Sequence, residues 1–231
     1  MAIRPHGGDN GCGAGGNDIS WTSHLGALLG GAVVENFGIK GSRIAIKADR
    51  TDSFVERLDG IDDAADIYIV FGGVNDFSRN VPLGELGSTD AHEFYGAVDY
   101  LIRTITARSP QAKLVFMTPC KTSGKHEKDI PASDEANHLG LTQDAYVRAM
   151  LEVCDRYSVP VIACMRKAAS ARFCRSTASS ICRTVCITVL PAMSAWRIAS
   201  PRVSPPFAAK SLPFAGNIGL TFTLYSPFAL H

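Results

Sequence analysis

The residues best suited to chemistry in this chain follow an apolar run and begin with two glycines. Residues Ile67–Phe71 are continuously apolar, and they are followed by Gly72-Gly73-x-Asn75-Asp76. An apolar run that ends at glycine is typical of a strand buried on both faces. In an open parallel sheet, ligands bind beyond the carboxyl ends of such strands, where the Asn75 amide could donate a hydrogen bond to an oxyanion. The alternative is a plain strand-to-helix turn in which Asp76 is a local cap.

A second motif of the same kind lies earlier in the chain. A short predicted strand over residues 33–37 ends in the turn Asn36-x-Gly38-x-x-Gly41, and Ser42 follows directly. Because glycine has no Cβ, Gly41 can offer its backbone N–H to a ligand at close range. The two motifs together supply two hydrogen-bond donors at strand ends, which is what stabilisation of a developing negative charge requires.

The ordered pair of motifs resembles the second and third sequence blocks of the SGNH (GDSL-type) hydrolases, over roughly residues 10 to 163. The resemblance implies a serine esterase of acyl or acetyl esters, in which Gly41 and Asn75 help to form the oxyanion hole. It implies no cofactor and no metal, and it makes a small-molecule or carbohydrate ester the expected substrate. Ser42, beside Gly41, and His126, in a polar loop, are further candidates for substrate contact.

The chain departs from this family at the residues that would carry out the reaction. A serine esterase needs a serine nucleophile, a histidine base and an aspartate that orients the imidazole. The family's Gly-Asp-Ser and Asp-x-x-His blocks are absent as written, and the strand that should precede the nucleophile is missing. We therefore expect an SGNH-type esterase that is inactive in this form.

The elements that must position these residues predict an α/β fold. Buried-strand patterns alternate with amphipathic helices, which favours right-handed crossovers and a parallel sheet covered on both faces. The expected architecture is a three-layer α/β/α sandwich of the flavodoxin-like, SGNH-hydrolase type. Helices are expected near residues 19–29, 53–58, 89–108 and 142–157, and parallel strands near 32–37, 66–71, 113–118 and 159–163.

The composition changes sharply near Asp155. All 22 acidic residues lie in residues 1–155 with 14 of the 23 basic residues, whereas residues 156–231 carry nine basic residues and no acid. Neither the period of a strand nor that of a helix persists after residue 163. The chain is therefore divided into an SGNH-like domain, residues 1–163, incomplete at its N-terminus, and a poorly ordered tail, residues 164–231.

One explanation for the tail is that the chain is translated out of frame near residues 1–6 and 163–164. When each codon's third base is read with the next two bases, synonymous codons allow a Gly-Asp-Ser block whose serine straddles Ile3 and Arg4. The same shift allows an Asp-x-x-His block within residues 183–187. The alternative is an intact, diverged gene whose shifted reading matches by chance.

Other functions fit the sequence less well. The main alternative is a non-catalytic binding protein whose basic tail contacts a polyanion. The tail lacks clustered basic runs and aromatic platforms, so no nucleic-acid partner is expected. No apolar stretch is long enough to cross a membrane, and no secretory signal is evident, which favours a cytoplasmic protein without membrane contact. The seven cysteines form no metal-binding pairs.

Overall fold

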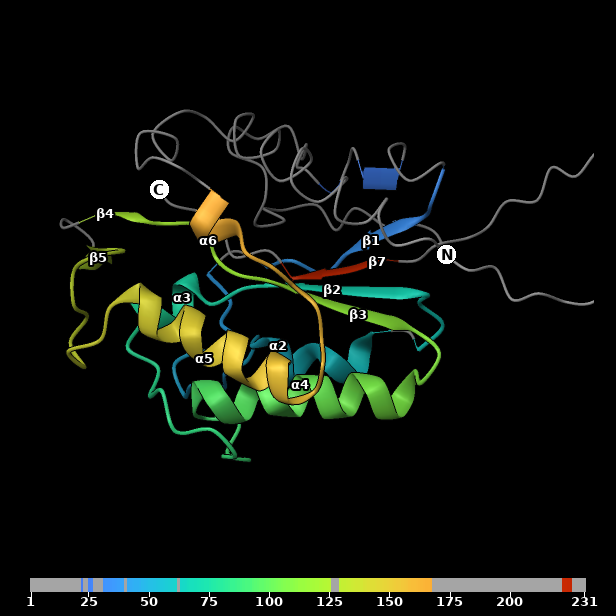
Figure 1. The fold of residues 1–231 in the computed structure, drawn as a ribbon, viewed down its shortest axis with the longest axis horizontal. Coiled ribbons are helices and arrows are strands. Elements are labelled where there is room, and N and C mark those ends of the chain that lie inside the picture. Colours follow the sequence, from blue (N-terminus) through green and yellow to red (C-terminus); the bar gives the residue numbers. More distant parts are fainter. Residues whose placement is uncertain are drawn as a thin grey trace, which may run out of the picture.

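The chain forms a parallel sheet with helices packed against it (Figure 1). The computed structural model describes residues 22, 25–26, 31–39, 41–61, 63–125, 129–167 and 222–225. Within these ranges the main sheet has five strands, all parallel, in the spatial order β1-β7-β2-β3-β6. The α/β prediction is confirmed, and all four predicted strands are present. The five strands are β1 (Val34–Asn36), β2 (Ile67–Phe71), β3 (Lys113–Met117), β6 (Val161–Ile162) and β7 (Phe222–Tyr225).

Helices cover the lower face of the sheet in Figure 1, and these are α2 (Phe54–Arg57), α4 (Phe94–Arg108) and α5 (Gln143–Arg156). A short 3-10 turn, Leu58–Gly60, continues α2. The helix α3 (Val74–Ser78) follows β2 at the carboxyl ends of the strands, and α6 (Cys164–Lys167) follows β6 on the opposite side of the sheet from α4. None of the helices in the described ranges is long and apolar enough to cross a bilayer.

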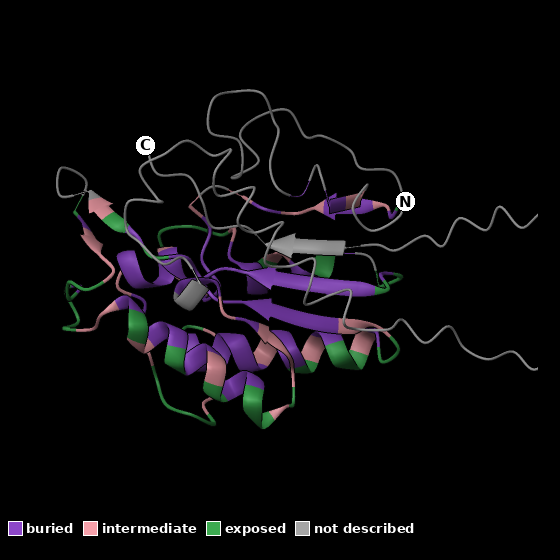
Figure 2. Cartoon of the chain, turned by 45° about the horizontal axis from the view of Figure 1, so that its top comes forward, coloured by how far each residue is buried: buried purple, intermediate pink, exposed green. Residues whose placement is uncertain are grey.

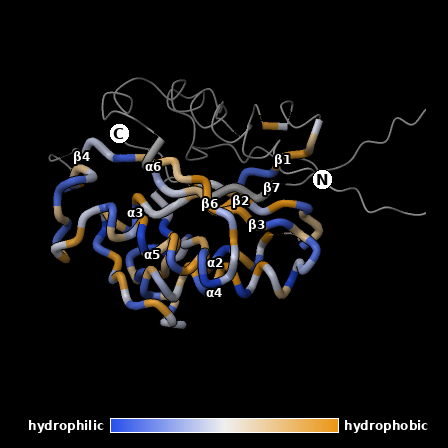
Figure 3. The backbone as a smooth tube through the Cα atoms, in the orientation of Figure 1, coloured by the Kyte–Doolittle hydropathy of each residue, from blue (hydrophilic) through white to orange (hydrophobic). Residues whose placement is uncertain are grey.

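The two central predicted strands, β2 and β3, are buried on both faces (Figure 2). Tyr68 and Val70 pack into the core formed with α2, α4 and α5, whereas Ile69 and Phe71 are fully buried without belonging to that cluster. Figure 3 shows hydrophobic residues concentrated along these strands. Burial on both faces explains why β2 is continuously apolar instead of alternating.

Local sequence explains where two of the helices begin. Ser53 is the N-cap of α2 in a capping box: its side chain accepts from the backbone N–H of Glu56, and the Glu56 carboxylate accepts from the backbone N–H of Ser53. The predicted helix at 89–108 begins five residues later, at Phe94, because the preceding residues form a turn. In that turn the Ser88 hydroxyl donates to Glu93 at 2.6 Å and the backbone N–H of His92 donates to Asp90 at 2.9 Å.

Two features of the fold were not predicted. The strand β7 comes from the acid-free tail and pairs in parallel with both β1 and β2, so that Tyr225 lies opposite Val70. Of the tail, the structure describes residues 164–167, which form α6, and 222–225, which form β7; the other tail residues lie outside the described ranges, so a poorly ordered tail stays a prediction. An antiparallel hairpin of β4 (Ser123–Lys125) and β5 (Ile130–Ala132) also follows β3.

Candidate functional site

The two predicted donor residues meet at the carboxyl ends of the strands. Asn75 lies in the first turn of α3, and its Nδ2 donates to the backbone oxygen of Ser42 at 2.9 Å. Because Ser42 is bonded directly to Gly41, the Asn75 amide lies beside the Gly41 turn. Both Asn75 and Gly41 are partly exposed. The contact joins two motifs that are separated by more than thirty residues in the sequence.

Two glycines allow the chain to turn from β2 into α3 within two residues. Gly73 is the N-cap of α3 and has a φ of 107°, a left-handed conformation that glycine adopts without a steric penalty. A Cβ at Gly72 would lie 2.7 Å from Cε2 of Phe54 and 2.9 Å from Cγ1 of Ile44, which leaves no room for a side chain. These glycines bring Asn75 to the end of the strand.

The Gly41 turn is held by side chains from the segment that follows it. Gly41 has a φ of 76°, and the backbone N–H of Ser42 donates to Ile39 at 3.2 Å. The Ser42 side chain is buried, donates to the backbone oxygen of Asp52 at 2.6 Å, and accepts from Arg57 at 3.1 Å. The Ser42 hydroxyl is thus buried and hydrogen-bonded within the protein. This geometry does not support the expected contact between Ser42 and substrate. His126, the other expected contact, lies outside the described residues.

Asp76 has a different role from the local cap considered as one reading of the sequence. Its side chain is completely buried, and its two carboxylate oxygens accept the backbone N–H groups of Ile44 and Ala45, each at 3.0 Å. Burial raises the pKa of Asp76 to about 6, against the opposing effect of these two amides and of Arg43. The carboxylate therefore joins α3 to the segment that follows the Gly41 turn.

Two histidine–aspartate pairs occur in the described part of the chain, and both lie at the surface. His92 Nδ1 is 2.9 Å from Asp90, and His138 Nε2 is 3.1 Å from Asp129, with each histidine side chain 66% exposed. Among the described residues, no serine hydroxyl is hydrogen-bonded to either imidazole. Neither pair therefore forms the nucleophile–base arrangement of a serine esterase.

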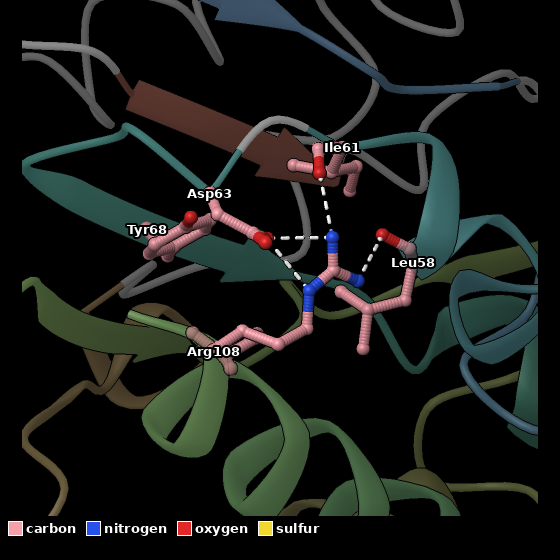
Figure 4. Close-up of a pocket in the computed structure, with 6 residues that line it drawn as sticks. Leu58, Ile61, Asp63, Tyr68 and Arg108 are labelled. Carbon is pink, nitrogen blue, oxygen red and sulfur yellow. Dashed lines mark hydrogen bonds and ion pairs between the residues drawn. The ribbon is translucent and has the colours of Figure 1, made fainter. Parts of the chain in front are cut away.

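A shallow pocket without room for a water molecule lies beside Tyr68, near the amino-terminal end of β2 (Figure 4). Its polar centre is Arg108, whose guanidinium donates to the Asp63 carboxylate at 2.6 Å and to the backbone oxygens of Leu58 and Ile61 at 2.9 Å each. These bonds tie the end of α4 to the segment before β2. We assign this pocket a structural role.

The parallel sheet with its helices, and the position of Gly41 and Asn75 at the carboxyl edge of the sheet, are those of an α/β protein of the SGNH type. The sequence profile of the GDSL-like lipase/acylhydrolase family matches residues 6–180, and the chain belongs to this family. The match confirms the family that the two sequence motifs indicated. No protein of curated function is significantly similar in sequence.

Solved structures share this fold. One crystal structure has 76% sequence identity and a TM-score of 0.75, over 82% of this chain and 91% of its own. A protein from Lactobacillus plantarum has 24% identity and a TM-score of 0.65, over 78% and 91% of the two chains. A carbohydrate acetylesterase family member from Sinorhizobium meliloti has 14% identity and a TM-score of 0.57, over 79% and 89%. At these last two identities the likeness concerns the fold alone.

Proposed function

We propose that this chain derives from an esterase of small acyl or acetyl esters, carbohydrate-linked esters included, and that Gly41 and Asn75 are its oxyanion donors. The observation that carries this proposal is the 2.9 Å hydrogen bond from Asn75 to the backbone of Ser42, which holds the amide beside the Gly41 turn. Membership of the GDSL-like lipase/acylhydrolase family supports ester hydrolysis.

The chemistry assigns these donors to the tetrahedral intermediate. When a nucleophile attacks the ester carbonyl carbon, the carbon–oxygen double bond opens and negative charge develops on the oxygen. The Gly41 N–H and an N–H of the Asn75 amide stabilise that charge, and the intermediate then collapses as the alcohol leaves. Donors that are fixed before the reaction stabilise the charge without reorganising during it, which makes them effective in lowering the barrier.

We expect negligible turnover from the chain as written. Oxyanion donors alone leave only a small residual rate when the nucleophile and its base are missing. In the family these groups belong to the Gly-Asp-Ser and Asp-x-x-His blocks, which the sequence lacks. If the chain is translated out of frame near residues 1–6 and 163–164, a corrected coding sequence would restore both blocks and is expected to be active.

Hydrolysis of p-nitrophenyl acetate by the written and the frame-corrected chains tests the proposal. In the corrected chain, Asn75→Ala should lower kcat by roughly 10²–10³, the usual effect of removing one oxyanion donor. Asn80→Gly is the matched control: it removes an amide just beyond α3, at a φ of 57° that glycine accepts, and should leave kcat unchanged. Equal kcat values for Asn75→Ala and the parent would refute the assignment of Asn75.

A fluorophosphonate probe separates the two readings of the written chain. Labelling of one serine, located by mass spectrometry, together with substantial turnover, would show that the chain has a nucleophile outside the family's block. If the corrected chain neither hydrolyses esters nor reacts with the probe, the esterase proposal fails. The non-catalytic binding protein then becomes the better interpretation.

A further inference from the structure

Adjacent residues of α3 hold the Gly41 turn at two points. Asn75 donates to the backbone oxygen of Ser42 at 2.9 Å, and Asp76 accepts the backbone N–H groups of Ile44 and Ala45 at 3.0 Å each. The first contact binds a carbonyl and the second binds two successive amides. Together they fix both the position and the orientation of the backbone that follows Gly41.

Only a carboxylate can make the Asp76 contacts. Two neighbouring N–H groups need two acceptor oxygens, whereas the amide of an asparagine has one acceptor and would point its NH₂ group at the other donor. Asp76 is completely buried. If this position served packing alone, an apolar side chain would fill it at a lower cost in desolvation. A buried charge with both oxygens directed at one turn points to a requirement for that geometry.

The charged and titratable groups around Asp76 lie on two segments, the one that follows Gly41 and the helix α5. Arg43, in the Gly41 turn, is buried and paired with Asp49 at 2.7 Å. On α5, burial raises the pKa of Tyr146 to about 12, with a smaller contribution from the charge of Asp76. The Tyr146 hydroxyl donates to the backbone oxygen of Val81 at 2.6 Å. Arg43 is therefore the one cation that acts on Asp76 among its described neighbours.

We propose that Asp76 is the positioning residue of the oxyanion site. Its carboxylate holds the Ile44 and Ala45 amides, so that the Gly41 backbone and the Asn75 amide keep a fixed position and orientation relative to each other. This inference rests on the proposed function of Gly41 and Asn75 as donors. Asp76 itself touches no substrate in this scheme. It acts through the turn, which Arg57 also holds by donating to Phe37 at 2.5 Å and to Ser42 at 3.1 Å.

NMR of the ¹⁵N-labelled full chain tests the proposal without requiring activity. In the parent, the Ile44 and Ala45 amide protons should titrate together with a midpoint near pH 6, following the Asp76 carboxylate. In Asp76→Asn that titration should disappear, and the resonances of the Gly41 N–H and the Asn75 side chain should shift. Exchange of the Ile44 and Ala45 amides should become about 10- to 100-fold faster, because each loses a charge-assisted bond.

Asp99→Asn is the matched control. Asp99 is also a buried aspartate, 6% exposed, but it binds Arg103 and Tyr157 between α4 and α5. Its replacement should leave the Gly41 and Asn75 resonances in place. If Asp76→Asn also leaves them in place, the positioning role is refuted. Should Asp76→Asn fail to fold, amide exchange in the parent still decides, since Ile44 and Ala45 amides that exchange as fast as amides without an acceptor would contradict the proposal.

The outcome for Asp76 can be told apart from the outcome for the esterase proposal. In the frame-corrected chain, Asp76→Asn should lower kcat with little change in KM, because misplaced donors weaken binding of the transition state more than binding of the ester. If Asn75→Ala does not lower kcat but Asp76→Asn still moves the turn, the proposed function fails and the structural link stands. If Asn75→Ala lowers kcat but Asp76→Asn moves nothing, only the positioning role fails.

Discussion

The buried carboxylate of Asp76 predicts an unusual dependence of stability on pH. Burial raises the pKa of this group in the folded chain to about 6, from 3.8 for an ordinary aspartate. Below about pH 4 both the folded and the unfolded chain carry the proton. Between about pH 4 and 6 the unfolded chain loses this proton while the folded chain keeps it. The folded chain then binds more protons, so its stability falls as the pH rises through this window.

The magnitude follows from the size of the rise in pKa. An increase from 3.8 to about 6 corresponds to about 3 kcal/mol, which is lost from the free energy of unfolding once the pH exceeds about 6. Asp76 is completely buried, so no reduction for solvent screening applies. Asp76→Asn removes the titration. The variant instead carries a cost in stability of about 1–3 kcal/mol that does not change with pH, because one buried N–H donor is left without an acceptor.

Urea unfolding followed by circular dichroism measures this difference. The free energy of unfolding is determined at several pH values from 4 to 7.5 for the parent and for Asp76→Asn, so that the other carboxylates cancel. Relative to the variant, the parent should lose about 2.5 kcal/mol across this range, because the rest of the change lies below pH 4. A difference between the two that does not change with pH would show that Asp76 is not titrating with a raised pKa. A parent that gains stability relative to the variant as the pH rises would reverse the sign and refute the reasoning.

Two further predictions concern the framework of the site. Gly72→Ala should destabilise the chain by about 1–3 kcal/mol, because the added Cβ meets Phe54 at 2.7 Å; Gly60→Ala, where a Cβ meets nothing within 4 Å, is the control in thermal unfolding. Deletion of residues 222–231 should lower the melting temperature and promote aggregation, since it leaves the backbone of β2 unpaired along one edge. Deletion of residues 227–231, which spares β7, is the control for light scattering, and equal behaviour of the two deletions would contradict the strand's role.

Much of the fold could be predicted because its signals are local. The apolar run at β2 and the amphipathic periods of α4 and α5 lie within single segments, and each element is present. The position of β7 could not be read in this way, because the pairing that places it between β1 and β2 joins residues more than 150 positions apart. A signal for the strand itself was available: Phe222-Thr223-Leu224-Tyr225 is a run of strand-favouring residues that follows Gly219.

The same distinction applies to the site. Gly41 and Asn75 could be named as candidate donors because each belongs to a short motif with glycines at fixed spacing. The tasks of Ser42 and Asp76 depend on their partners, Asp52 and the Ile44–Ala45 amides, and the pairing of Asp76 crosses more than thirty residues. No local pattern tells a buried carboxylate that binds a distant turn from one that caps its own helix.

The contacts that fix Gly41 and Asn75 also explain how this half of the proposed catalytic site could persist without the other half. The Gly41 turn is held by Arg57, Asn75 and Asp76, and every one of these contacts lies within residues 37–76. None of them involves β7 or the acid-free tail. The oxyanion half should therefore keep its geometry whatever segment fills the sheet between β1 and β2. Under the frameshift hypothesis, in contrast, the nucleophile and its base would come from segments at both ends of the chain. Restoring those segments should therefore return activity to donors that are already in place.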